Sequence, residues 1–330
     1  AQCVCVSPSE RGSSGDRWLR RHPDGVRTVG FRVRDVEHTR RILSERGATM
    51  CTDLMAADDQ QGQPYRWFDI ATPLGDVRFR FVERAADGLP PGFAPVEPMG
   101  QANRHRFQVI DHITSNLLTI HPHATWLRGI MGFEEYWRVH FHTADINSES
   151  GGSGLASIVM WDSESGIKLA NNEPVIPNYE QSQIYTFVEA NRGPGVQHVA
   201  FHVPEISPAV DGMRQSGIEF LDTPATYYDM LPERLAAQKV SNFAEDLDEL
   251  QRLGILVDGE DDRYLLQIFM VEGGLLYDDS QAGPFFYEVI QRCGARGFGE
   301  GNFRALFEAI ERDQQQRESV QRQLEAGAGS

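Results

Sequence analysis

The sequence predicts an α+β protein built from repeated βαβββ modules, in which short strands form curved, open-barrel sheets. Three observations support this prediction. A strand-plus-helix unit occurs twice along the chain, a second strand beyond it also occurs twice, and single helices separate the short strands. The chain has 330 residues, 40% hydrophobic and 24% charged, which is typical of a globular protein with two domains.

The first repeated unit begins with a strand. Residues 25–33 read GVRTVGFRV and residues 195–203 read GVQHVAFHV, so Val, Phe and Val alternate at matching positions in both copies. This period of two predicts a strand with one buried face. A helix-like stretch follows without a gap in each copy, and the two stretches reach equivalent glycines, Gly47 and Gly217.

The other face of this strand differs between the copies. In the first copy it carries Thr28 and Arg32, whereas in the second it carries His198 and His202 with the small Ala200 between them. Imidazole nitrogen is a common metal ligand, and arginine is not one. Only the second copy can therefore contribute to a metal site.

The second repeated strand occurs at residues 77–84, which read VRFRFVER, and at residues 285–292, which read FFYEVIQR. Aligning the terminal arginines places Arg80 opposite Glu288. A carboxylate is again present only in the later copy. A curved sheet encloses a pocket lined by its inward-facing residues, so an inward His and an inward Glu are candidate ligands.

A linker separates the copies. Residues 85–106 contain four prolines and several glycines, which is the composition of a connecting segment. The sequence predicts a boundary near residue 100, with an amino-terminal domain at 1–100 and a catalytic domain at 101–330. The first domain is expected to be non-catalytic, because its copies of the two strands lack the His and the Glu.

Charge and composition exclude several classes of function. The formal charge is −17, with 48 acidic and 31 basic side chains, so we expect no nucleic-acid partner. No apolar run approaches the ~18 residues of a membrane helix, so we expect no membrane partner. The four cysteines form no CxxC pair, which predicts a reducing, cytoplasmic location. The chain starts without Met, as though inside a strand, and this suggests a fragment.

Three residues on three separate strands are candidate metal ligands: His112, His198 and Glu288. Two imidazoles and one carboxylate leave open positions on a metal, the arrangement that suits non-haem Fe(II). The spacings are wide, so no short-range motif supports the set. Alternatively, His198 is a hydrogen-bonded histidine on a half-buried strand and Glu288 pairs with Arg292. The absence of both residues from the first copy favours the metal site.

Other candidate motifs have simpler interpretations. His140 and His142 share a strand face, and His121 and His123 flank a proline at a helix start, so we interpret both pairs as surface or packing residues. Residues 297–303 read GFGEGNF, which departs from the GxGxxG of a dinucleotide site.

A terminal helix is predicted after these glycines. Phe303, Leu306, Phe307 and Ile310 recur at helical spacing and form an apolar stripe. The stripe predicts that the first turns of this helix cover an apolar surface, with the glycines as a hinge.

Several of these segments resemble the 4-hydroxyphenylpyruvate dioxygenase family, of the vicinal oxygen chelate superfamily. The resemblance covers most of residues 105 to 313 in order and extends more weakly into residues 15 to 84. Its motifs are Ile110-Asp111-His112, Gly195-Val196-Gln197-His198-Val199-Ala200, Leu265-Leu266-Gln267-Ile268-Phe269, Phe286-Tyr287-Glu288-Val289-Ile290-Gln291-Arg292 and Gly297-Phe298-Gly299-Glu300-Gly301-Asn302-Phe303.

The resemblance implies the vicinal oxygen chelate fold, with a C-terminal helix over the catalytic barrel and Fe(II) held by His112, His198 and Glu288. It implies conversion of 4-hydroxyphenylpyruvate, a 2-oxo acid, and O2 to homogentisate and CO2 in tyrosine catabolism. It also implies a cytoplasmic homo-oligomer, a dimer or a tetramer. About half of the family's amino-terminal domain is missing from this chain, so that domain is expected to be incomplete.

The resemblance further implies a substrate pocket with polar and aromatic walls. Its polar residues are Ser157, Asn172, Gln183, Gln267 and Asn302, and its aromatic residues are Phe269, Phe286, Phe298 and Phe303. Beyond these and the metal ligands, no separate catalytic residue is expected. The alternative to each amide is an ordinary surface residue, and the alternative to each phenylalanine is core packing.

Three further functions remain open at this point. Hydroxymandelate synthase, a relative within the family, takes the same substrate but oxidises the benzylic carbon; it has an apolar residue at the position of Asn172 and a tyrosine at that of Phe303, so these two residues favour ring hydroxylation here. A non-catalytic binding protein of the same fold is the other alternative, although it would have lost the ligand triad. The ligand types also leave open a zinc or manganese lyase or isomerase.

Overall fold

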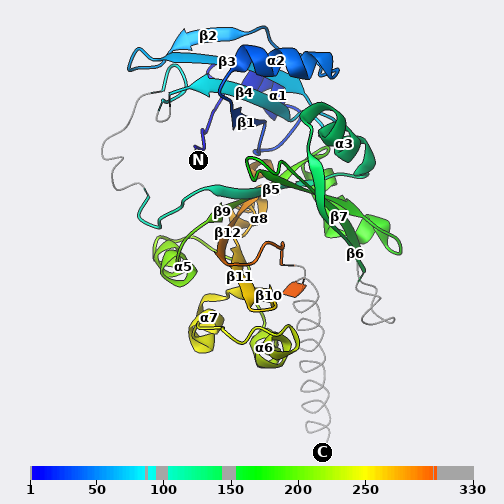
Figure 1. Cartoon of the computed structure of the whole chain (residues 1–330), viewed down its shortest axis with the longest axis vertical. Coiled ribbons are helices and arrows are strands. Elements are labelled where there is room, and N and C mark those ends of the chain that lie inside the picture. Colours follow the sequence, from blue (N-terminus) through cyan, green and yellow to red (C-terminus); the bar gives the residue numbers. More distant parts are fainter. Residues whose placement is uncertain (1, 86–87, 94–102, 143–153, 300, 303–330) are drawn as a thin grey trace, which may run out of the picture.

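The computed structural model describes residues 2–85, 88–93, 103–142, 154–299 and 301–302, and its strands form two sheets (Figure 1). The first sheet has the order β1-β4-β3-β2. Its strands are β1 (Thr28–Arg32), β2 (Met55–Asp58), β3 (Pro64–Ala71) and β4 (Arg78–Arg84).

The second sheet has eight strands in the order β10-β11-β12-β9-β5-β8-β7-β6. These are β5 (Ile110–Asn116), β6 (Glu134–His142), β7 (Gly154–Trp161), β8 (Lys168–Pro174), β9 (Gly195–His202), β10 (Leu256–Glu260), β11 (Arg263–Phe269) and β12 (Phe286–Cys293). Parallel and antiparallel pairs both occur, which confirms the predicted α+β class with mixed sheets.

Helices connect the strands. They are α1 (Ser14–Leu19), α2 (Val36–Glu45), α3 (His121–Trp126), α4 (Gln183–Ala190), α5 (Ile206–Gln215), α6 (Ala225–Ala237), α7 (Leu247–Leu253) and α8 (Gly273–Leu276). A π-helical segment, η2 (Leu127–Met131), and two 3-10 turns, η4 (Tyr179–Gln181) and η5 (Ser280–Ala282), are also present. None of the helices in the described ranges has the length and apolar character needed to cross a bilayer. The terminal helix predicted from Phe303 lies outside the described residues.

The predicted repeat is present in the fold. The helices α2 and α5 occupy equivalent positions in the two copies, and each is followed by a glycine with positive φ, +91° at Gly47 and +83° at Gly217. At this position of a helix end the left-handed conformation favours glycine.

The second repeat is present in the strand register. Strands β1 and β4 pair in parallel with Gly30 beside Arg80, and β9 and β12 pair in parallel with Ala200 beside Glu288. Arg80 and Glu288 are therefore equivalent, as the sequence predicts. In the first copy, Arg80 forms two hydrogen bonds with the buried carboxylate of Asp69, at 2.7 and 2.9 Å, so an ion pair occupies this position.

Two hydrophobic cores hold these layers together. One packs helices α5, α6 and α7 against strands β10 to β12, with Leu250 and Val257 fully buried. The other is shared by the two sheets: it joins Phe79 and Phe81 of β4 to Leu127 and to Met160 of β7. The four-stranded sheet and half of the eight-stranded sheet therefore share one apolar interior.

A buried histidine also joins the two halves of the chain. His22 lies among polar neighbours in the sequence, yet it is only 5% exposed. Its Nδ1 lies 2.8 Å from the carbonyl oxygen of Asn191, and its Nε2 lies 2.8 Å from a carboxylate oxygen of Asp76. The ring thus bridges a loop of the first sheet and the end of α4.

Candidate metal centre

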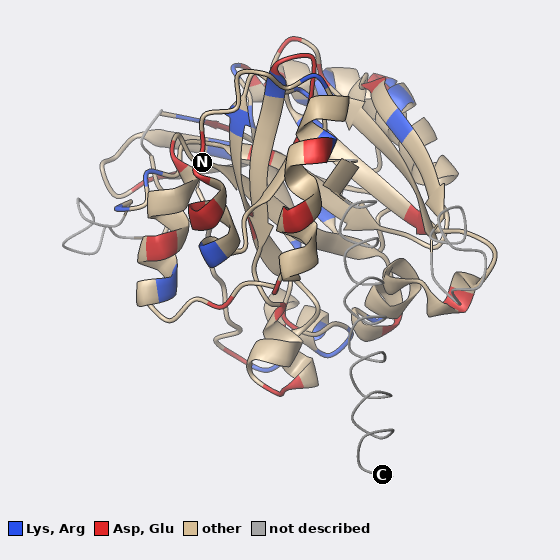
Figure 2. Ribbon diagram, turned by 90° about the horizontal axis from the view of Figure 1, so that it is seen from below, with Lys and Arg blue, Asp and Glu red and all other residues tan. Residues whose placement is uncertain are grey.

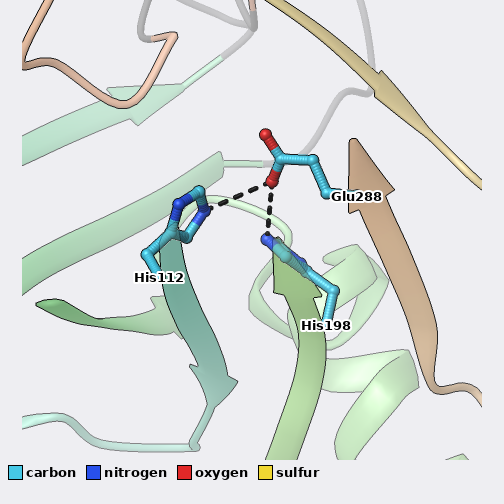
Figure 3. A group of neighbouring side chains, drawn as sticks. All are labelled: His112, His198 and Glu288. Carbon is cyan, nitrogen blue, oxygen red and sulfur yellow. Dashed lines mark ion pairs between the residues drawn. The ribbon is translucent and has the colours of Figure 1, made fainter. Parts of the chain in front are cut away.

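Strands β12, β9 and β5 are neighbours in the eight-stranded sheet, and each contributes one residue to a cluster (Figure 3). Ala200 of β9 is in register with both His112 of β5 and Glu288 of β12. His198 lies two residues before Ala200 and therefore shares its face. The cluster comprises the three candidate ligands, whose donor atoms all lie within 4.8 Å of one another. The methyl group of Ala200 is the small side chain beneath them.

Glu288 differs from the other buried acidic residues of the described chain. Figure 2 colours the acidic and basic positions of the ribbon red and blue; among the described acidic residues, Asp59, Asp69 and Glu288 are buried. Asp69 pairs with Arg80, and Asp59 accepts backbone N–H groups. Glu288 is 2% exposed, its Oε1 has no hydrogen-bond partner, and its Oε2 lies 3.2 Å from Nε2 of both His112 and His198. A buried carboxylate without a cation is costly.

The two imidazole rings are oriented by their other nitrogens. Nδ1 of His112 lies 2.9 Å from Oδ1 of Asp111, and Nδ1 of His198 lies 3.1 Å from Oε1 of Gln197. With a proton on each Nδ1, both Nε2 atoms carry lone pairs that face the carboxylate of Glu288. Such an arrangement is held together either by a proton on one of the Nε2 atoms or by a metal cation that takes the place of that proton. The residues present therefore fit a divalent metal with outer partners on both rings.

The strand geometry explains why Asp111 can reach the ring of the next residue. Ile110 pairs with Phe201 and His112 with Ala200, so Asp111 is an extra residue in a β-bulge. A bulge turns a side chain away from strict alternation. Its carboxylate also receives Arg292, whose Nε and Nη2 donate to the two oxygens at 2.6 and 2.7 Å. Arg292 therefore pairs with Asp111, and the alternative in which Glu288 pairs with Arg292 is wrong.

Asp111 and Gln197 were missed by the sequence analysis. Each immediately precedes a ligand histidine in the chain, and each offers a side-chain oxygen. That adjacency is the signal that could have identified them. It was overlooked because neighbouring residues of a regular strand point to opposite faces.

Electrostatics in the centre keeps the carboxylates ionised. Burial raises the pKa of Glu288, but the two imidazoles outweigh it and bring that pKa down to about 2. Burial lowers the pKa of His112, but Glu288 and Asp111 together raise it to about 8. For His198 burial prevails and the pKa is lowered. Arg292 and His112 hold the pKa of Asp111 far below its ordinary value in spite of burial. Arg292 neutralises Asp111, so the charge of Glu288 is left to the two imidazoles or to a cation that replaces the imidazole proton.

Aromatic side chains surround the cluster. The ring of Phe286 stacks on His198 with centroids 5.0 Å apart, and Phe269 meets the same imidazole edge to face at 5.9 Å. Phe298 lies over His112 at 5.0 Å. Three of the four predicted aromatic residues therefore line the metal ligands. The fourth, Phe303, lies outside the described residues.

The predicted polar residues divide into two groups. Ser157 and Asn172 are buried and in register on β7 and β8, and Gln267 is buried on β11, two residues before Phe269 and so on the same face. In contrast, Gln183 is exposed at the first turn of α4, and its described contacts do not join it to the others. Asn302 is buried, but its Oδ1 accepts from the hydroxyl of Tyr227 at 2.6 Å, on the helical side of β10.

The open side of the curled sheet contains a cavity of about 1040 Å³. Its walls come mainly from the edge strands β6 and β10, from residues 295–298 and from Gly301. None of the three triad residues lines it, but Phe298, which covers His112, does. The cavity therefore adjoins the aromatic shell of the centre and marks the gap between the two edges of the sheet.

Comparisons with known proteins extend this description. Residues 109–231 match the model of the Glyoxalase/Bleomycin resistance protein/Dioxygenase superfamily. A 4-hydroxyphenylpyruvate dioxygenase of Dictyostelium discoideum is 35% identical over 314 residues, covering 91% of this chain and 80% of that protein. One of Danio rerio is 37% identical over 309 residues, covering 90% and 74%. A mutant of 4-hydroxymandelate synthase from Streptomyces coelicolor has a similar structure, with a TM-score of 0.68 at 26% identity, covering 94% of this chain and 82% of that one.

Proposed function

The chain belongs to the 4-hydroxyphenylpyruvate dioxygenase family, and from this premise we propose that it converts 4-hydroxyphenylpyruvate and O2 to homogentisate and CO2 with Fe(II). The family resemblance of the sequence is thereby confirmed, and the chain is an enzyme with the vicinal oxygen chelate fold. The observation that carries the proposal is the buried carboxylate of Glu288, which faces two imidazole nitrogens and whose Oε1 has no hydrogen-bond partner among the described residues.

His112, His198 and Glu288 would hold the iron. When bound, Fe(II) supplies chelation of the 2-oxo acid and activation of O2, with one oxygen atom entering the new carboxylate and the other entering the ring. Asp111 and Gln197 fix the ring orientations of the two histidines. Arg292 holds Asp111 and also donates to the carbonyl oxygen of Gly297 at 2.8 Å, which ties the segment carrying Phe298 to the metal ligands.

The surrounding side chains would orient the aromatic ring and exclude water. Phe269, Phe286 and Phe298 form apolar walls beside the histidines. Ser157, Asn172 and Gln267 offer buried polar groups for the substrate hydroxyl and ring edge. We extend the proposal to Gln183, Asn302 and Phe303 on the family resemblance alone. The position of the ring relative to the metal decides which carbon is oxidised.

Hydroxylation of the benzylic carbon, giving hydroxymandelate, is the second candidate. The similar fold of the 4-hydroxymandelate synthase mutant supports it. Asn172 supports the ring reaction. Its carboxamide lies in a buried polar row across β5, β8 and β7. Hydroxymandelate synthase has an apolar residue at this position.

The deciding experiment is product analysis. The protein is loaded with Fe(II) without oxygen, mixed with 4-hydroxyphenylpyruvate and O2, and its products are identified by mass and retention time. We expect homogentisate and one equivalent of CO2. Hydroxymandelate would support the second candidate, and absence of iron-dependent turnover would contradict both.

Cellular role and assembly are also proposals. Family membership supports tyrosine catabolism in the cytoplasm and a homo-oligomer, a dimer or a tetramer. It also supports the division into domains at 1–100 and 101–330, although the two sheets share a hydrophobic core. Light scattering coupled to size-exclusion chromatography measures the number of subunits, and a monomer would contradict the proposed assembly.

A further inference from the structure

Asn116 carries an unsatisfied hydrogen-bond donor inside the catalytic sheet. It is the last residue of β5, four positions after His112, and therefore lies on the same face of the strand. Its exposure is 0%, and its Nδ2 has no hydrogen-bond partner in the described structure. Leaving a buried N–H group unpaired is costly, so such a group calls for an explanation.

The neighbouring strand supplies the other half of the arrangement. Asn172 of β8 is in register with Asn116, and its Nδ2 donates to Oδ1 of Asn116 at 3.1 Å. One hydrogen bond therefore consumes one donor and one acceptor of the pair. Nδ2 of Asn116 and Oδ1 of Asn172 are left over. Reversing both amides would again leave one unpaired amino group next to one unpaired carbonyl oxygen.

Asn171, the next residue along β8, has a different arrangement. It is equally buried but lies on the opposite face, and its Nδ2 donates to the carbonyl oxygens of both Ile158 and Leu169, at 3.1 and 2.9 Å. Its amino group is used by the backbone of the sheet. The amino group of Asn116 is not, although both residues come from the same layer of strands.

A hydroxyl group has the chemistry that completes the Asn116–Asn172 pair, because it accepts one hydrogen bond and donates another. We propose that Asn116 is a specificity-determining residue that donates to the phenolic oxygen of the substrate, while the phenolic hydrogen is donated to Asn172. This inference rests on the proposed function. It adds a residue to the site and gives each atom of the pair a role.

The spacing along β5 agrees with such a substrate. At ~3.3 Å per residue, the backbone of Asn116 lies roughly 13 Å from that of His112. One end of a para-hydroxylated aryl 2-oxo acid would bind at the metal ligands, and its hydroxyl would point along the strand toward the pair. Thr114, buried between them on the same face, has a short side chain.

The test compares substrates with and without the hydroxyl group. Anaerobic binding of 4-hydroxyphenylpyruvate and of phenylpyruvate to the Fe(II)-loaded protein is measured by calorimetry, and kcat/KM is measured for both. We expect the wild type to prefer the hydroxylated compound, and Asn116→Leu to lower that preference about tenfold, the worth of roughly one hydrogen bond. Binding and turnover of phenylpyruvate should change little.

Asn171→Leu is the matched control, because it removes a carboxamide of equal burial from the opposite face and should leave the preference unchanged. Asn116→Ala replaces Asn116→Leu if the latter does not fold, as judged by circular dichroism. An unchanged preference in the Asn116 variant, or equal losses for both compounds, would overturn the inference while leaving the proposed function intact. A wild type that binds neither compound would overturn the proposed function and the inference together.

Discussion

Glu288 shows how a single residue can reveal the purpose of a site. Its carboxylate lies in an apolar interior, its pKa is depressed by two imidazoles, and one of its oxygens has no partner. A buried carboxylate with an unused oxygen is costly unless a cation completes its coordination. In the equivalent position of the first copy, an arginine has its own buried aspartate and needs no ligand.

We predict that Glu288→Ala abolishes stoichiometric Fe(II) binding, with affinity reduced more than ~100-fold, because two imidazoles alone are a poor site for this ion. The fold should be retained, since the strand hydrogen bonds do not involve this side chain. Anaerobic calorimetric titration measures the affinity, and circular dichroism monitors the fold. The exposed carboxylate of Glu219 supplies the control, Glu219→Gln, which should bind iron normally. Wild-type iron occupancy in Glu288→Ala would remove this residue from the triad.

His123 makes the stability of the protein depend on pH. It is 1% exposed and stacked on Trp126 with centroids 6.0 Å apart, so the interpretation as a packing residue is confirmed. Burial lowers its pKa to about 4. The unfolded chain, with a pKa near 6.5, therefore binds the proton first as pH falls. Stability should be complete above pH ~6.5, decrease by roughly 3 kcal/mol down to pH ~4, and then level off with respect to this group.

The corresponding test is denaturant unfolding between pH 4 and pH 7.5. We expect His123→Gln to flatten the dependence in this window, because the variant has no titratable side chain at this buried position. The exposed His121 provides the control, His121→Gln, which should retain the slope of the wild type. A slope equally steep in His123→Gln would show that other groups account for the pH dependence.

At the scale of secondary-structure elements, the segment after β12 determines what covers the metal ligands. Arg292 at the end of β12 donates a hydrogen bond to the carbonyl oxygen of Gly297. The hydroxyl of Tyr227 of α6 donates one to Oδ1 of Asn302. Phe298 and Gly299 lie between these two attachments. Gly299 has a φ of +75°, and a Cβ atom there would come within 2.4 Å of Nε2 of Gln267. The close approach of backbone to the Gln267 carboxamide therefore depends on glycine.

We predict that Gly299→Ala lowers kcat/KM at least ~10-fold while iron binding is unchanged. The added methyl group must displace either Gln267 or the segment that carries Phe298, and small displacements of positioning groups are costly in turnover. The control is Gly297→Ala, two residues earlier, where a Cβ atom would meet nothing within 4 Å. Equal activity of the two variants would show that the contact between Gly299 and Gln267 does not position the substrate.

At the scale of the whole molecule, the shared apolar interior links the four-stranded sheet to the catalytic one. Phe79 of β4 is 1% exposed and meets Trp126 of α3 edge to face at 5.7 Å, so side chains from both halves interdigitate. The buried His22 adds polar contacts to Asp76 and Asn191. A core common to two sheets favours a single cooperative transition over independent unfolding.

We predict that Phe79→Ala lowers the free energy of unfolding by about 3–5 kcal/mol, as loss of a buried phenylalanine ring does. Because the core is shared, loss of iron binding should coincide with loss of secondary structure on heating. Circular dichroism and metal release, followed in parallel, measure the two transitions. Phe93→Ala removes a phenylalanine that is 38% exposed and serves as the control. Separate transitions for the two signals would contradict a common core and favour the domain boundary near residue 100 as a thermodynamic one.

The sequence by itself predicted the repeat, the α+β class and the three candidate metal ligands. The repeat and two of these candidates follow from local patterns: alternation along a strand, the recurrence of two strand patterns, and the presence of His198 and Glu288 in one copy only. Because a strand period of two assigns each side chain to a face, the pattern also predicted that Arg80 and Glu288 are equivalent, as the parallel registers confirm.

Only the tertiary structure decided which groups support those ligands. Asp111 reaches His112 because of a bulge, and Arg292 reaches Asp111 across 181 residues of chain. Asn116 meets Asn172 because β5 lies beside β8, although 56 residues separate them. The physical reason is that hydrogen bonds and ion pairs depend on strand order and on irregularities of register, and neither is encoded in the periodicity of a single segment.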